Sequence, residues 1–375
     1  MKYFDYAATT PMCEGAIAAY TEAAKLCFGN ESSLHDEGHK AKQVLEASRQ
    51  IIASNLGVKD ECIVFTSGGT ESNQLGIQTL LKNTPSNRKH IICSSLEHHS
   101  IHQSLFQLQE QGYEIEYMEH LSNGIVNLEF LQKQIKETTA LIILQHVNSE
   151  IGIIQPIADV HQLIHDQNIL LHVDCVQSFG KLDCKTMHEY VDSLAISSHK
   201  VYGPKGVGAI SFPHIHTLQP YQTAVTHEHG YRSGTVNVPG IYSFAVAVNN
   251  LKKSNHIPSL RSIILKNLQA SQISFECIEG EEKQQLPHII CLLFPKVQGQ
   301  YVMMELNKLG YCVSSGSACQ SGTKEPSKVL LSIGKDADEA KSSIRISLGM
   351  HNTEEQCLSL AQDLSHIIAM LLTQP

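Results

Sequence analysis

The sequence predicts an α/β protein whose central sheet is mainly parallel. Short apolar runs occur at residues 62–65, 90–93, 141–144, 169–173, 194–196 and 207–211, and each has the length of a strand buried on both faces. Most of these runs are separated by stretches long enough for a helix. Strands that alternate with helices imply right-handed crossovers, and ligands then bind beyond the carboxyl ends of the strands. We therefore expect the functional residues directly after these runs.

Two helices are indicated by their apolar periodicity. Apolar residues between positions 41 and 56 recur at helical spacing, and Gly57 follows where a C-terminal glycine usually stands. Near the end of the chain, Thr353 and Gln356 have the spacing of a capping box, and an apolar stripe follows from Cys357 to Leu371. The second pattern is typical of a helix that packs on a core.

The hydrophobic pattern of the sequence changes past about residue 245, where the helical stretches become longer and the strand patterns become weaker. We expect a large domain at residues 12–245 and a smaller α+β domain formed by residues 1–11 with 246–375. A chain of 375 residues is long enough to bury such cores.

Composition limits the partners and the compartment. The formal net charge of −9 weighs against direct binding to nucleic acid, which favours a basic surface. The N-terminus has no signal-peptide pattern and no run approaches eighteen apolar residues, so we expect a cytoplasmic protein that does not span a membrane. Eleven cysteines without CxxC pairs argue against a disulfide framework or a structural zinc site. A small molecule or another protein is the expected partner.

A glycine-rich turn follows the first predicted strand. Ser67-Gly-Gly-Thr70 leads into a predicted helix, and glycines with a helix N-terminus allow backbone N–H groups to approach an anion. This predicts a phosphate site, although a turn without a ligand has the same signature. The segment matches neither a P-loop nor a dinucleotide fingerprint.

Asp174 and Lys200 each follow a predicted buried strand. An acid in this place can accept a hydrogen bond from a protonated ring nitrogen, as pyridoxal chemistry requires, although it can equally cap a helix or form a structural ion pair. A lysine in a site can bond covalently to an aldehyde, whereas an exposed lysine is inert. The two residues are one β–α–β unit apart. We expect them at the same edge of the sheet.

Cys319 lies in a run of small polar residues, 313–323, whereas most of the other cysteines fall in apolar segments. It is the candidate nucleophile. The 21 histidines include the pairs His98/His102, His214/His216 and His227/His229, so we considered a transition-metal site. Because there is no HExxH motif, we predict that no metal is bound.

Ten segments together resemble the cysteine desulfurases of the NifS/IscS type, over nearly the whole chain. These enzymes are class V members of the fold-type-I PLP-dependent transferases. The segments are residues 4–11, 28–30, 65–72, 97–98, 146–152, 172–177, 197–200, 232–235, 314–319 and 343–345. The last cysteine-containing segment, Ser-Ser-Gly-Ser-Ala-Cys, is similar to the group with a long catalytic loop.

The resemblance implies pyridoxal 5'-phosphate as cofactor and a role for each matching residue. Lys200 would bind the cofactor covalently, His98 would stack on its ring, Asp174 would pair with the ring nitrogen and Gln177 would meet the phenolic oxygen. The expected phosphate ligands are Gly69, Thr70, Ser197 and His199. Thr235 is similar to a residue that reaches the other subunit's phosphate, which implies a homodimer.

The resemblance also implies a substrate site. Asn148 and Arg345 would bind the substrate carboxylate, since a guanidinium fork matches two oxygens, with Asn148 also near the cofactor and Asn30 near the substrate. The implied reaction converts L-cysteine to L-alanine and leaves the sulfur on Cys319 as a persulfide, for delivery to an acceptor protein in iron–sulfur cluster assembly or in tRNA or cofactor thiolation. Because the chain ends at Pro375, directly after its last predicted helix, we expect a tRNA-thiolation partner or another dedicated acceptor rather than an iron–sulfur scaffold.

One segment departs from the family pattern. Residues 224–228, Ala-Val-Thr-His-Glu, stand where relatives usually have three glycines before the histidine or glutamine. This departure leaves open a non-catalytic binding subunit of the same fold. The nearest other reading is a class V aminotransferase or β-lyase, which needs no thiol nucleophile.

Overall fold

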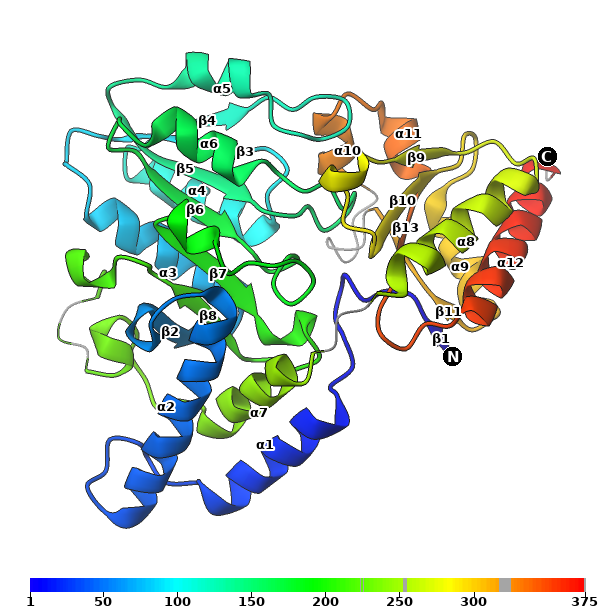
Figure 1. Cartoon of the computed structure of the whole chain (residues 1–375). Coiled ribbons are helices and arrows are strands. Elements are labelled where there is room, and N and C mark those ends of the chain that lie inside the picture. The colour runs from blue at the N-terminus through cyan, green and yellow to red at the C-terminus, as the bar shows by residue number, and fades with distance from the viewer. Residues whose placement is uncertain (223, 225, 252–254, 317–324, 374–375) are drawn as a thin grey trace.

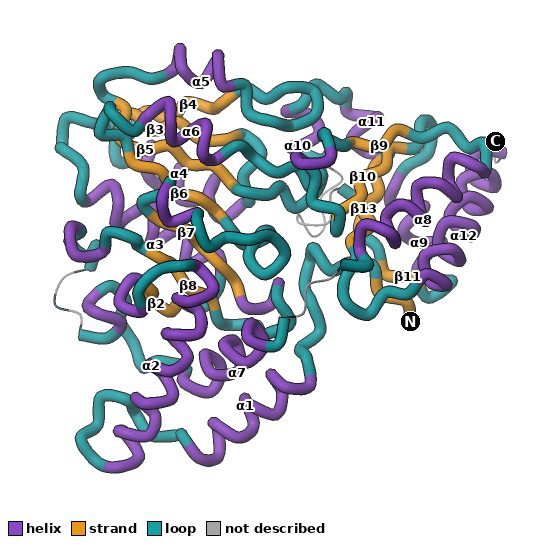
Figure 2. Tube along the Cα trace, in the orientation of Figure 1, coloured by secondary structure: helices purple, strands orange, loops and turns teal. Residues whose placement is uncertain are grey.

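The computed structural model describes residues 1–222, 224, 226–251, 255–316 and 325–373. These residues form two bodies side by side, a large one around a seven-stranded sheet and a smaller one around a four-stranded sheet (Figures 1 and 2). In the large sheet the strand order is β2-β8-β7-β6-β5-β3-β4. The predicted α/β class is confirmed.

The large sheet is parallel except for β8, which runs antiparallel to β2 and β7. All six predicted runs are strands. β4 was not predicted, because its residues alternate between charged and apolar at the edge of the sheet and only its last residue is buried. The strands are β2 (Ile63–Thr66), β3 (His90–Ser94), β4 (Glu114–Met118), β5 (Thr139–Gln145), β6 (Leu170–Asp174), β7 (Ser193–Ser197) and β8 (Gly208–Ser211).

Helices cover both faces of this sheet, which explains why its strands are apolar without alternation. Neighbouring residues of β3 show the two faces: Ile91 packs in one cluster with α3 and α4, whereas Ile92 packs in another with α2 and α6. α2 ends as predicted, with Gly57 in the left-handed region at φ 70°. The helices are α1 (Glu14–Leu26), α2 (Asp36–Leu56), α3 (Gly69–Lys82), α4 (His99–Glu110), α5 (Leu128–Gln134), α6 (Ile157–Ile164) and α7 (Val238–Asn249).

The small body is built on an antiparallel sheet with a helical layer of α8, α9 and α12 on it. The predicted capping box is present: the Gln356 N–H donates to Thr353 Oγ1 at 3.2 Å, and the Thr353 N–H donates to Gln356 Oε1 at 3.4 Å. The strands are β9 (Glu276–Ile278), β10 (Ile289–Leu293), β12 (Ser314–Ser315) and β13 (Ser343–Ser347); the helices are α8 (Ile257–Ala270), α9 (Gly299–Lys308), α10 (Lys328–Ser332), α11 (Ala337–Lys341) and α12 (Glu354–Thr373).

The N-terminal segment connects the two bodies. β1 (Lys2–Tyr3) pairs in parallel with β11 (Tyr311–Cys312) of the small body, and the chain then crosses to the large body, where the Thr10 N–H donates to the carbonyl of His199 at 2.9 Å. The division at residue 245 stays a prediction. That position lies inside α7, which packs against α1 and α2. Among the described residues, no helix is both long and apolar enough to cross a membrane.

Candidate active site

Asp174 and Lys200 lie at the same edge of the large sheet. β6 ends at Asp174, and its parallel neighbour β7 ends at Ser197, directly before the 3₁₀ turn η3 (Ser198–Lys200). The predicted placement is therefore confirmed. This edge faces the small body (Figure 1).

The carboxylate of Asp174 is buried and held by two N–H donors. Asn73 Nδ2 donates to Oδ2 and the Val176 backbone N–H donates to Oδ1, both at 2.8 Å. The Asn73 amide is itself oriented by His172, whose Nε2 lies 3.1 Å from Asn73 Oδ1. Burial lowers the pKa of His172 to about 3, so this ring is neutral and its Nε2 carries a proton for that contact. Sequence reasoning missed Asn73, which follows the matched segment 65–72.

His98 is linked to the same network. As the N-cap of α4 it accepts a hydrogen bond from the Ser100 N–H at 3.2 Å, and its Nδ1 lies 2.8 Å from Ser100 Oγ, which Asn73 Nδ2 approaches at 3.3 Å. Desolvation lowers the pKa of His98, Asp174 opposes that shift and Lys200 adds to it. The ring therefore stands near both charged groups in a fixed orientation.

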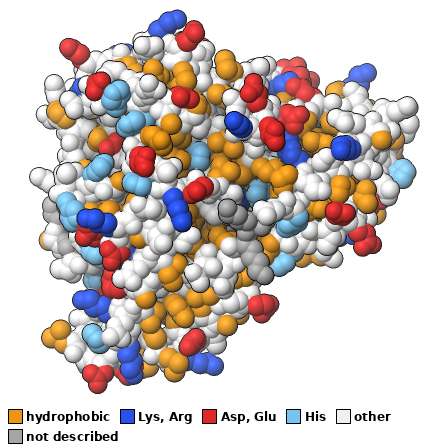
Figure 3. Space-filling model, viewed as in Figure 1, with side chains coloured by type: hydrophobic (Ala, Val, Ile, Leu, Met, Phe, Trp, Pro, Cys, Tyr) orange, Lys and Arg blue, Asp and Glu red, His pale blue; other side chains and the backbone are white. Residues whose placement is uncertain are grey.

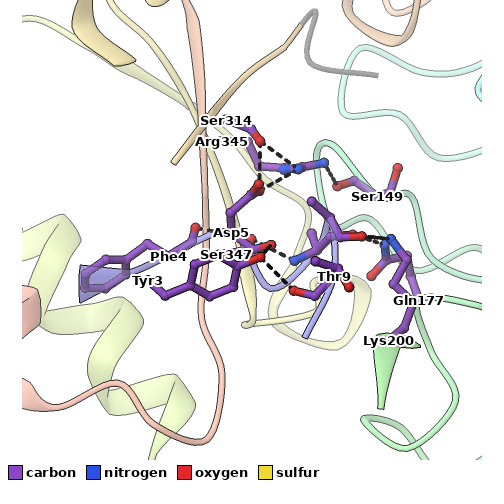
Figure 4. A network of polar contacts seen from close by, with 12 residues as sticks. Tyr3, Phe4, Asp5, Thr9, Ser149, Gln177, Lys200, Ser314, Arg345 and Ser347 are labelled. Carbon is purple, nitrogen blue, oxygen red and sulfur yellow. Dashed lines mark hydrogen bonds and ion pairs between the residues drawn. The ribbon is translucent and has the colours of Figure 1, made fainter. Parts of the chain in front are cut away.

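Lys200 and Gln177 meet on the N-terminal segment (Figure 4). Lys200 Nζ donates to the carbonyls of Ala7 and Ala8, the latter at 2.8 Å, and Gln177 Nε2 donates to the Ala7 carbonyl at 2.9 Å. A segment from the start of the chain thus closes over the end of β7.

Lys181 is a second lysine in this region that the sequence did not suggest. Its Nζ lies 3.1 Å from both the carbonyl and the side-chain oxygen of Gln177. Since the Ala7 carbonyl can only accept, the Gln177 amide turns its NH₂ group to Ala7 and its oxygen to Lys181. Burial, together with the charge of Lys200, lowers the pKa of Lys181 to about 7.

Three of the predicted phosphate residues lie at the turn between β2 and α3: Gly69 and Thr70 begin α3, and a Cβ on Gly69 would lie 3.6 Å from Ser197 Cβ. Gly69 is closely packed, since a Cβ there would lie 2.9 Å from Val176 Cγ2, and Thr70 is exposed in the first turn of α3. Ser197 Oγ is buried and has no hydrogen-bond partner among the described residues. His199 Nδ1 lies 3.1 Å from Thr9 Oγ1, and desolvation lowers the pKa of His199 to about 4.

Arg345 projects from β13 of the small sheet and is 5% exposed. Its Nη2 donates to Asp5 Oδ1 at 2.8 Å and to Ser314 Oγ at 3.1 Å, and its Nη1 donates to the Ser149 carbonyl at 3.1 Å (Figure 4). Its Nε is buried without a partner in the described part of the chain. The guanidinium therefore spans the junction between the two bodies.

Asn148 is buried nearby, and its side chain shapes the loop that carries Ser149. Its Nδ2 donates to the Leu96 carbonyl at 3.1 Å, and its Oδ1 accepts the N–H groups of Glu150 and Ile151 at 2.8 and 2.9 Å. Its predicted contacts with cofactor and substrate stay predictions.

A cleft of 470 Å³ opens beside this junction. Its lining includes His98 and Glu150 from the large body and Gly316 and Ser327 from the small one. Ser327 Oγ donates to Glu150 Oε2 at 2.6 Å, so the two walls are joined. Apolar side chains gather at the surface of this junction in Figure 3.

Three predicted residues are not placed at this site by the structure. Asn30 is exposed on the loop between α1 and α2, at the lower end of Figure 1, where its Oδ1 accepts the Ser32 N–H at 2.9 Å. Thr235 is exposed on the connection to α7. Cys319 lies outside the described residues. The ten other cysteines are buried or partly buried, as expected for packing residues.

Two described residues of the segment that departs from the family pattern, and His229 directly after it, have a left-handed backbone without being glycine. Ala224 has φ 61°, and Glu228 and His229 have φ 45° and 56°. Glu228 is held by Arg49 through two contacts of 2.9 Å and accepts the Phe65 N–H at 2.6 Å. The last residue of this segment, Glu228, therefore forms a buried ion pair with Arg49 and a hydrogen bond with β2.

One group of potential metal ligands occurs among the described residues, at the far edge of the sheet, and consists of His90, Glu114 and Glu116. Lys136 Nζ lies 2.7 Å from Glu114 and 2.9 Å from Glu116, so an ammonium group already pairs with these carboxylates.

Comparisons with known proteins agree with this geometry. The family model described as aminotransferase class-V matches residues 2–360. A putative cysteine desulfurase NifS of Bacillus subtilis is 42% identical, over 100% of this chain and 95% of the relative, and a cysteine desulfurase IscS 1 of Archaeoglobus fulgidus is 36% identical, over 99% and 98%.

Solved structures give the same result. A NifS-like protein aligns with a TM-score of 0.90 at 31% identity, covering 99% of this chain and 100% of that one, and a structure described as SspA in complex with cysteine aligns at 0.82 and 33%, covering 93% and 99%. Full-length similarity joined to the arrangement of Asp174, Lys200 and Arg345 shows that the chain belongs to the class-V aminotransferase family and, within it, to the cysteine desulfurases of the NifS/IscS type.

Proposed function

We propose that this protein removes sulfur from L-cysteine and releases L-alanine, with pyridoxal 5'-phosphate bound at Lys200 and with Cys319 as the sulfur acceptor. The observation that carries the proposal is the position of Asp174 and Lys200 at one edge of the large sheet, which faces the body that carries Arg345. The matching relatives named cysteine desulfurases support the same assignment.

The residues at the sheet edge fit this cofactor. The Gly68–Gly69 turn at the start of α3 suits a phosphate group, together with the Ser197 hydroxyl, which has no partner in the described part of the chain. The fixed carboxylate of Asp174 suits a protonated ring nitrogen. The Gln177 NH₂ group, one N–H of which donates to the Ala7 carbonyl, would donate its second N–H to the phenolic oxygen. When bound, the cofactor supplies an electron sink for the pair released at the substrate Cα.

Side chains of this chain would bind the substrate and move its proton. Arg345 would pair with the carboxylate of L-cysteine, which fixes the orientation of Cα. Lys200 Nζ would then take the proton from Cα and later return a proton to the product, because its amine would be released from the cofactor beside Cα. Asp174 would keep the ring nitrogen protonated throughout.

Cys319 would complete the sulfur transfer. Its thiolate would attack the sulfur of L-cysteine, so an S–S bond forms while the C–S bond breaks and its electron pair stays with the carbon. The products would be L-alanine and a persulfide on Cys319. Cys319 is three residues beyond Gly316, which lines the cleft, and three residues span at most about 11 Å.

The further partners are part of this proposal. The persulfide sulfur would pass to an acceptor protein, either an iron–sulfur scaffold or a tRNA-thiolation protein, and the active form would be a cytoplasmic homodimer to which Thr235 and Asn30 contribute. Both residues are exposed in the single chain, which fits a role toward a second subunit.

A visible absorption spectrum before and after addition of L-cysteine, with alanine and sulfide assayed in the same tube, tests the proposal. A cofactor band that changes with L-cysteine, with equal amounts of alanine and of sulfur released by a reductant, is the expected result. A band that changes without sulfur release would favour the aminotransferase or lyase reading. Absence of a band would favour a binding subunit.

A further inference from the structure

The carboxylate of Asp5 forms an ion pair with Arg345, whose guanidinium is proposed to bind the substrate. Its Oδ1 accepts both Arg345 Nη2 and Ser314 Oγ at 2.8 Å (Figure 4). The Asp5 side chain is 19% exposed and that of Arg345 is 5% exposed, so water screens this ion pair weakly. The two residues are 340 positions apart in the sequence, and Asp5 is positioned by the same N-terminal segment that contacts Lys200.

When no substrate is bound, Asp5 neutralises the charge of the buried Arg345 guanidinium. A buried guanidinium without a counter-charge is strongly unfavourable, and Asp5 supplies that charge from the adjacent segment. The contacts with Ser314 and the Ser149 carbonyl then hold the guanidinium plane in place. Arg345 Nε remains buried and without a partner in the described residues, so one N–H donor of the oriented guanidinium is still available to a ligand.

The arrival of a substrate carboxylate changes this balance. Two carboxylates would then share one guanidinium, and like charges a few ångströms apart repel in a poorly screened site. The resident carboxylate therefore weakens the binding of any amino acid whose carboxylate contacts Arg345. Weak binding in the ground state favours the departure of the product.

We propose that Asp5 is a positioning residue that serves as the resident counter-ion of Arg345, keeping it oriented in the empty site and limiting its affinity for amino-acid carboxylates. This inference rests on the proposed role of Arg345. A purely structural role for Asp5 predicts the opposite sign, since loss of a structural contact would loosen Arg345 and weaken ligand binding.

The test is the affinity of the cofactor-loaded Asp5→Asn variant for L-alanine, measured by titration of the visible spectrum. Asparagine keeps the shape and an acceptor oxygen but removes the charge. We expect the dissociation constant for L-alanine to fall by about tenfold. Ethylamine, which is alanine without its carboxylate, should bind both proteins equally. The KM for L-cysteine should fall in parallel.

Two further variants keep the test decisive. Asp363→Asn removes the same charge from α12, where the carboxylate accepts the Tyr311 hydroxyl at 2.6 Å, and should leave the L-alanine affinity within about twofold of wild type. Asp5→Ser retains a small acceptor and should shift the affinity in the same direction as Asp5→Asn.

Unchanged or weaker L-alanine binding in both Asp5 variants would overturn the assignment, as would equal tightening of ethylamine. Failure of the proposed function is a separate result, because wild-type protein would then release no sulfur from L-cysteine. Failure of the Asp5 assignment appears only in the variants.

Discussion

The side-chain amide of Asn73 donates to the carboxylate of Asp174 at 2.8 Å, and its oxygen is engaged by the buried ring of His172. In this orientation the NH₂ group of Asn73, and not its oxygen, faces Asp174. The carboxylate therefore has a hydrogen-bond donor beside it.

Asn73→Asp should impair the enzyme for that reason. Two carboxylates at this distance cannot both ionise, so a proton would be shared between them and Asp174 would no longer hold the ring nitrogen in its protonated form. We expect turnover of L-cysteine to fall by at least about tenfold. Steady-state kinetics measures this, with Asn55→Asp on α2, where Asn55 Nδ2 donates to the Ile51 carbonyl at 2.9 Å, as the control. Normal turnover in Asn73→Asp would contradict the proposed role of Asp174.

Cys319→Ser should separate cofactor binding from sulfur transfer. A serine hydroxyl cannot accept the substrate sulfur as a persulfide, so sulfide release should fall to the background, whereas the cofactor band should match that of wild type. The paired control is Cys312→Ser, a partly buried cysteine on β11 of the same body. If Cys319→Ser still releases sulfur at the full rate, another group is the acceptor.

Lys181 should give the protein a pH-dependent stability. Its pKa is about 7 in the folded protein and 10.5 ordinarily, so between these values the unfolded chain binds a proton that the folded protein does not. Burial of protonated Lys181 therefore lowers the free energy of unfolding by its full amount below pH 7, and this loss of stability disappears as the pH rises toward 10.5. Urea unfolding of wild type and Lys181→Met at pH 6, 7.5 and 9 should show wild type gaining stability relative to the variant as pH rises. A constant difference would show that Lys181 is not desolvated.

Glu228→Gln should destabilise the protein strongly. Arg49 and Glu228 form a buried pair with side chains 2% and 1% exposed, and loss of one charge leaves the other uncompensated, at a cost of about 3–5 kcal/mol in the free energy of unfolding. Glu46→Gln removes a half-exposed partner of the same arginine, 39% exposed, and should cost about 0–1 kcal/mol. Equal effects of the two substitutions would argue against this account.

The sequence predicted the fold because burial on both faces leaves a local signature. Each central strand of the sheet reads as a continuous apolar run, and Gly57 and the Thr353/Gln356 pair mark helix ends within a few residues of the apolar stripes. β4 has no such signature, because an edge strand keeps charged residues such as Glu114 and Glu116. Its position follows only from its pairing with β3.

The site was predicted where a residue follows a strand, and missed where partners are distant in the sequence. Asp174 and Lys200 stand at strand ends, and the family resemblance suggested the roles of most other site residues. Asn73 contacts a residue 101 positions away and Asp5 one 340 positions away, and no local pattern reports such contacts. The same holds for Lys181, whose unusual environment depends on what packs around it.

The N-terminal segment has a consequence for biosynthesis. Contacts within it join residues that are separated by more than 300 positions: β1 pairs with β11, and the Ala7 N–H donates to Ser347 Oγ at 2.9 Å. The large body can begin to fold during translation, but the support that Ala7 and Ala8 give to Lys200 must wait until β13 has been synthesised. A nascent chain that has not yet reached Ser347 therefore lacks one of the contacts that hold this segment beside Lys200.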